Sequence, residues 1–65
     1  MTLTIKQQID GLRAYGEYQE AQIEALRKRF PGVSPGWVSE EVFTCAYNAR
    51  RARVEASNLE AAGEN

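Results

Sequence analysis

The stretch Phe30-Pro31-Gly32-Val33-Ser34-Pro35-Gly36 decides the fold of this chain, because it concentrates the helix-breaking residues in one short segment. It contains both prolines and two of the five glycines of the sequence. Residues of these types end helices and form turns. The segments on either side are about equally long and are rich in Ala, Glu, Gln, Leu and Arg, which favour helix. The sequence therefore predicts two helices joined by a turn at residues 31–36.

The segment before the turn carries core positions at alternating spacings of four and three residues. These positions are Ile5, Ile9, Leu12, Gly16, Gln19, Ile23, Leu26 and Phe30, and six of the eight are apolar. This spacing is typical of a helix that packs along one seam against another helix. Thr4 and Gln7 predict a capping box at its start, and Pro31 ends it. We expect a first helix over about residues 4–30.

The segment after the turn repeats the same spacing. Its core positions are Val38, Val42, Cys45, Ala49, Ala52, Ala56, Leu59 and Gly63. Ser34 followed by Pro35 predicts one helix start, whereas Ser39 with the acids that follow it predicts a later start near Glu40. Gly63 indicates the C-terminal end. We expect a second helix over about residues 36–62.

A short turn makes two consecutive helices antiparallel neighbours. In that register Phe30 lies near Trp37, and Gly16 and Gln19 face Ala49 and Ala52. The predicted fold class is all-α: an antiparallel two-helix hairpin that forms a single domain over residues 1–65.

A hairpin of this size has a marginal core. A single cysteine excludes an intrachain disulfide, and the lack of histidine argues against a zinc site. The second helix also carries a second apolar stripe of Phe43, Tyr47 and Val54, which two helices alone leave uncovered. We therefore expect a homo-oligomer, as a four-helix bundle or larger. The predicted interface residues are Phe43, Tyr47, Val54, Trp37, Tyr15 and Tyr18. Trp37 has a second interpretation, as a plug over the open end of the hairpin.

Charge and hydropathy exclude several classes of partner. Eight Lys and Arg residues against nine Asp and Glu residues leave a net charge of -1. A nucleic-acid-binding protein is usually strongly basic, so we do not expect nucleic acid as a partner. The apolar runs are too short for a transmembrane span, and the N-terminus lacks the apolar region of a signal peptide. We expect a cytoplasmic protein without a metal or cofactor.

Catalysis has little support in the sequence. It shows no histidine base, metal-binding cluster or phosphate-binding glycine loop, so we do not expect an enzyme. Cys45 is interpreted as a small core residue.

The arginines of the second helix have two interpretations. In the first, they form an anion site, because arginine binds phosphate bidentately and tyrosine stacks on bases. The predicted ligand contacts are Arg50, Arg51, Arg53, Tyr47 and Asn48. Alternatively they form a solvated face, in which Arg50 or Arg51 approaches Glu17 or Glu20.

The step Pro35-Gly36-Trp37-Val38, followed by Thr44, Asn48 and Arg50, resembles small phage proteins that sponge cyclic nucleotide immune signals. The resemblance covers the turn and half of the second helix. It implies an oligomeric protein that works without catalysis in the cytoplasm of the infected cell.

Three functional hypotheses follow. The first is sequestration of a small anionic ligand such as a nucleotide immune signal. The second is an inhibitor or adaptor that docks its apolar helix face on a host protein. The third is a structural component of a helical bundle.

Overall fold

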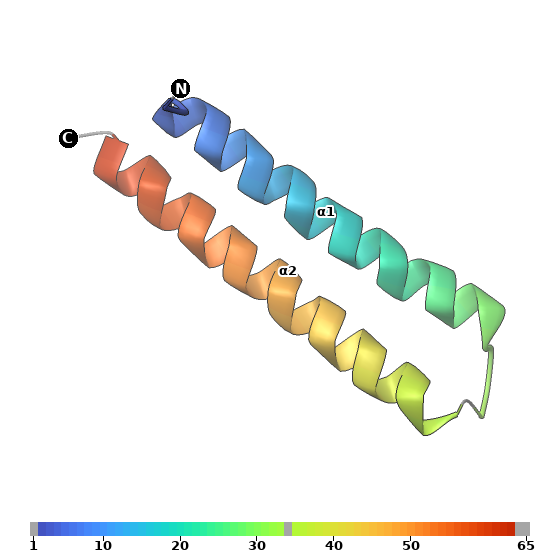
Figure 1. Cartoon of the computed structure of the whole chain (residues 1–65). Coiled ribbons are helices and arrows are strands. Elements are labelled where there is room, and N and C mark those ends of the chain that lie inside the picture. Colours follow the sequence, from blue (N-terminus) through green and yellow to red (C-terminus); the bar gives the residue numbers. More distant parts are fainter. Residues whose placement is uncertain (1, 34, 64–65) are drawn as a thin grey trace.

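The helix breakers between Phe30 and Gly36 separate two long helices in the computed structural model, which describes residues 2–33 and 35–63. Helix α1 spans Ile5–Arg29 and helix α2 spans Gly36–Gly63. They run antiparallel and side by side along the whole hairpin, so that the first and last turns lie at the same end (Figure 1). The described residues contain no strand. The predicted all-α hairpin is confirmed.

The start of α1 is fixed by the predicted capping box. The backbone N–H of Gln7 donates to Oγ1 of Thr4 at 3.1 Å, and the backbone N–H of Thr4 donates to Oε1 of Gln7 at 2.9 Å. Two N–H groups that a helix start leaves without partners are thereby satisfied. At the other end, Arg27, Lys28 and Arg29 occupy the last turn, where cations favour the helix dipole.

The turn brings two aromatic rings together at the closed end of the hairpin. Gly32 has a φ of 106°, which few residues other than glycine adopt readily. Phe30 and Trp37 then meet edge to face, with ring centroids 5.5 Å apart. The predicted neighbourhood of these two residues is confirmed. Helix α2 begins at Gly36, close to the earlier of the two predicted starts and not near Glu40; the predicted N-cap, Ser34, lies outside the described residues.

The core between the helices is built from small side chains. Helix α1 buries two residues, Ile9 and Gly16. Helix α2 buries five, which are Val38, Cys45, Ala49, Ala52 and Ala56. A Cβ atom placed on Gly16 would lie 3.6 Å from the carbonyl oxygen of Ala49, so the two backbones approach closely there. None of the large side chains in the described part is fully buried. The hairpin therefore buries little apolar surface for its length.

The close approach at Gly16 leaves room for one methyl group. We expect Gly16→Ala to raise the free energy of unfolding by about 0.5–1 kcal/mol, because alanine favours the helix and 3.6 Å is an ordinary contact distance. Gly11→Ala is the matched control, since a Cβ there meets nothing within 4 Å. Urea denaturation followed by circular dichroism measures the free energy of unfolding of both variants. A loss of stability in Gly16→Ala alone would show that the helices approach more closely than the structure indicates.

Neither helix of the described residues combines the length and the apolar character that crossing a membrane requires.

Candidate functional site

Helix α2 has one face buried against α1 and an opposite face that is exposed. Its buried residues face α1, whereas Phe43, Tyr47 and Val54 are 74%, 55% and 52% exposed. At about 100° per residue, these three lie about 170° around the helix from the buried row. Arg50 lies between them in the sequence, and the spacing of positions 43, 47, 50 and 54 is again four, three and four. We call Phe43, Tyr47, Arg50 and Val54 the outer face of α2.

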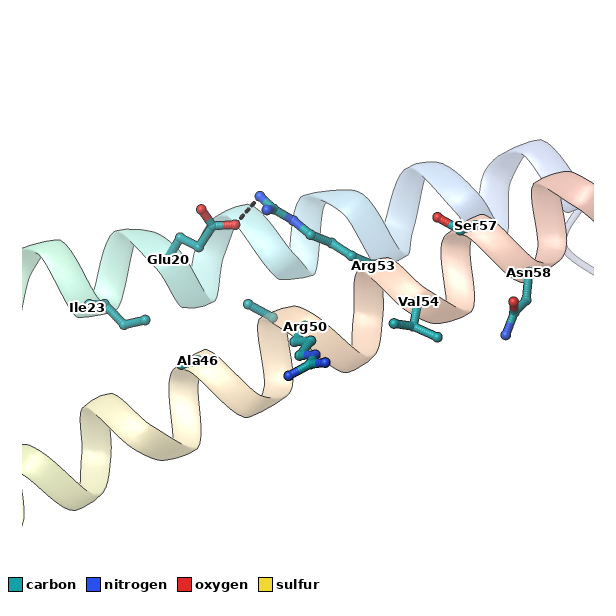
Figure 2. Close-up of a pocket in the computed structure, with 9 residues that line it drawn as sticks. Glu20, Ile23, Ala46, Arg50, Arg53, Val54, Ser57 and Asn58 are labelled. Atoms are coloured by element: carbon teal, nitrogen blue, oxygen red, sulfur yellow. Dashed lines mark ion pairs between the residues drawn. The ribbon is translucent and has the colours of Figure 1, made fainter.

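A shallow groove of about 490 Å³ runs along one edge of this face (Figure 2). Its lining comprises Glu20, Ile23, Ala46, Ala49, Arg50, Arg53, Val54, Ser57 and Asn58. Arg53 extends toward α1 and pairs with Glu20, whereas Arg50 points away from α1 (Figure 2). The two guanidinium groups therefore do not converge on one point in a single hairpin.

The third arginine lies on the opposite edge of α2. Arg51 pairs with Glu55, with its Nε 3.4 Å from Oε1 of the carboxylate. A side-chain hydrogen bond with Tyr47 and a second one with Glu55 raise the pKa of Arg51 above its ordinary value. Arg51 also lines a small pocket of about 170 Å³ together with Tyr15 and Asn48. Arg51 is thus engaged by Glu55 on its own helix.

The predicted ligand set is therefore divided among three directions. Arg53 is neutralised by Glu20, and Arg51 by Glu55. Arg50 makes no ion pair with the carboxylates of the described residues. Neither Arg50 nor Arg51 forms an ion pair with Glu17 or Glu20 among the described residues, because Glu20 pairs with Arg53 and Arg51 pairs with Glu55. Arg50 and Glu20 nevertheless line the same groove. The Arg51–Glu55 pair has the spacing of four residues that a helix brings together, a signal that is readable in the sequence.

The predicted interface residues also lie in more than one place. Phe43, Tyr47 and Val54 share the outer face of α2. Tyr15 and Tyr18 are exposed, 45% and 58%, but belong to α1 and not to that face. Tyr15 lies beside α2 and lines a pocket with Asn48 and Arg51. Trp37 packs against Phe30 at the closed end and keeps 54% of its surface exposed, which fits both of its interpretations.

Cys45 is a buried core residue that faces α1. Its Sγ lies 3.9 Å from Oε1 of Glu41. Burial, followed by the charge of Glu41 and the hydrogen bond to it, raises the pKa of the Cys45 thiol. A raised thiol pKa lowers the thiolate fraction and makes a poor nucleophile. Elsewhere in residues 2–33 and 35–63, no group of three or more His, Cys, Asp or Glu side chains is placed to hold a metal ion.

Comparisons with protein-family models, with curated proteins and with solved structures found no match for this chain.

Proposed function

We propose that this protein is a non-catalytic binding protein, and that its working surface is the outer face of α2. The observation that carries the proposal is the exposure of Phe43, Tyr47 and Val54 in one row on the side of α2 that α1 does not cover. Aromatic residues and arginine are the types that dominate binding energy at protein interfaces. A row spaced by four, three and four residues fits the side chains of another helix. The function is therefore docking of a second helix, as in an inhibitor or adaptor.

Native mass spectrometry of protein purified from its own cells tests this proposal, because it reports bound chains and small molecules together. Three versions are compared: the wild type, Phe43→Asp, and Val33→Asp as a matched control in the turn. Val33 is fully exposed and lies away from α2's outer face, so its substitution adds the same charge elsewhere. We expect bound mass in the wild type and in Val33→Asp, and its loss in Phe43→Asp. Equal bound mass in all three would contradict the proposal.

Capture of a small anionic ligand, such as a nucleotide immune signal in the cytoplasm, is a second candidate. One observation favours it: Arg50 is exposed, points away from α1 and lacks an ion pair with the described carboxylates, while Tyr47 lies one turn before it. A guanidinium without a carboxylate partner remains available to a phosphate.

Calorimetric titration with a cyclic dinucleotide and with nucleoside monophosphates checks this second candidate. We expect Arg50→Ala to weaken binding by about 10- to 100-fold, the usual effect of removing a charged hydrogen bond. Arg53→Ala should change it little, because Glu20 already occupies that guanidinium. An affinity that Arg50→Ala leaves unchanged would contradict the assignment of Arg50.

A further inference from the structure

We propose that the chain docked on the outer face of α2 is a second copy of this protein, whose α2 runs antiparallel to the first. The twofold axis passes midway between residues 48 and 49. The inference rests on the proposed function, since it names the partner of the same surface. Three properties of the hairpin carry it: its exposed area, the register of the outer face and the distribution of charge along that face.

The hairpin exposes more surface than a self-sufficient monomer of its mass. Its accessible surface is 5224 Å². A folded monomer of 7.3 kDa is expected to expose about 4,200 Å². The excess of roughly 1,000 Å² is close to the ~800 Å² that each partner buries in a stable interface. Since the core between α1 and α2 consists mainly of small side chains, covering this area also supplies the apolar burial that the hairpin lacks.

The outer face is symmetric about its own centre, which selects an antiparallel register. Positions 43 and 54, like positions 47 and 50, are equally distant from the point between residues 48 and 49. An antiparallel second copy centred there places Phe43 against Val54 of the second copy, and Tyr47 against Arg50 of the second copy. Each of these contacts occurs twice. An arginine over a tyrosine ring is a favourable cation–π pair, so Arg50 is accommodated inside an otherwise apolar seam.

The charges on α2 favour this arrangement over a parallel one. A parallel pair in register would place Arg50 opposite Arg50 and Glu40 opposite Glu40, and like charges that face each other destabilise helix pairs. The antiparallel register places Arg51 near Thr44 of the second copy, and Arg53 near Ala46 of the second copy. The midpoint of α2 lies between residues 49 and 50, so this register also overlaps the two helices along almost their whole length.

The position of the outer face sets the shape of the assembly. Because it lies about 170° from the face that packs on α1, the two copies form a row with both α2 helices in the middle and one α1 on each outside. This arrangement is a four-helix layer, and it differs from a square four-helix bundle.

Disulfide formation between single-cysteine variants tests the register. In a Cys45→Ala background, Thr44→Cys and Arg51→Cys are each exposed and flank the outer face without belonging to it. The antiparallel pair brings position 44 of one copy next to position 51 of the other. Two copies of position 44 are nine residues apart along the helix axis, or about 13 Å, and two copies of position 51 are five residues apart, or about 7.5 Å. Both separations exceed the ~7 Å between Cα atoms that a disulfide spans. A mixture of the two variants should therefore give mainly the mixed disulfide by mass spectrometry, and each variant alone little.

The outcomes separate this inference from the function on which it rests. Sedimentation equilibrium should give the wild type twice its monomer mass of 7.3 kDa. A monomer at sub-millimolar concentration would overturn self-pairing while leaving the outer face open to a different chain. A dimer in which Thr44→Cys links to itself would overturn the antiparallel register. A dimer linked through Tyr18→Cys on α1, and not through positions 44 and 51, would overturn both the inference and the proposed surface.

Discussion

Ala49→Leu is expected to lower the free energy of unfolding by about 1–3 kcal/mol, the usual cost of adding methylene groups to a packed core. Ala49 is 5% exposed, and its carbonyl oxygen would lie only 3.6 Å from a Cβ placed on Gly16. The two backbones are close at Gly16, so a leucine side chain at the buried position 49 has little room and pushes the helices apart. A core of small residues elsewhere offers few contacts that could offset the separation. Urea denaturation followed by circular dichroism gives the stability of the variant and of the wild type.

Ala21→Leu is the matched control for this substitution. Ala21 is an exposed residue of α1, and leucine is nearly as good a helix former as alanine. The free energy of unfolding of Ala21→Leu should stay within about 0.5 kcal/mol of the wild-type value. If Ala49→Leu behaved like Ala21→Leu, the two helices would not be in close contact at Gly16, and the register of the hairpin would have to be different.

That register was predictable from the sequence because its causes are local. The breakers between Phe30 and Gly36 fix where the chain reverses, and each helix carries one seam at spacings of four and three. The turn then places Phe30 beside Trp37 and Gly16 beside Ala49, as the structure shows. The start of α2 was left open by the sequence, since Ser34 and Ser39 are both acceptable caps. Proline at 35 sets the backbone angle for a first helical turn, and the structure begins α2 at Gly36.

The arginines of α2 were harder to interpret from the sequence. Arg50, Arg51 and Arg53 are close in the chain, but successive residues turn by about 100° around a helix. The three side chains therefore leave α2 in different directions, and each meets a different set of neighbours. Which carboxylate each one takes depends on how α1 is rotated against α2, a tertiary property that spacing alone does not determine. Arg53 pairs with Glu20 across the two helices, and Arg51 pairs with Glu55 along its own helix.

Among substitutions on the outer face of α2, Phe43→Asp is expected to weaken association the most. Phe43 is 74% exposed in the hairpin, so the substitution removes little packing within one chain. Its cost to the isolated hairpin should be a few tenths of a kcal/mol, mainly from the lower helix propensity of aspartate. In the antiparallel pair, however, each dimer contains two copies of Phe43 against Val54 of the other copy. Burying a phenylalanine contributes about 1.5–3 kcal/mol, so losing two should weaken dimerisation by at least about 100-fold.

Sedimentation equilibrium measures the dissociation constant, and circular dichroism at the same concentrations measures helicity. Val33→Asp should dimerise like the wild type, because Val33 lies in the turn. If Phe43→Asp loses its helicity together with its dimer, the milder Phe43→Ala separates folding from association, since alanine favours the helix. Phe43→Ala should then remain helical while dimerising more weakly. A Phe43→Ala protein that dimerises as tightly as the wild type would show that Phe43 contributes nothing to the interface, and the seam through Phe43 and Val54 would be wrong.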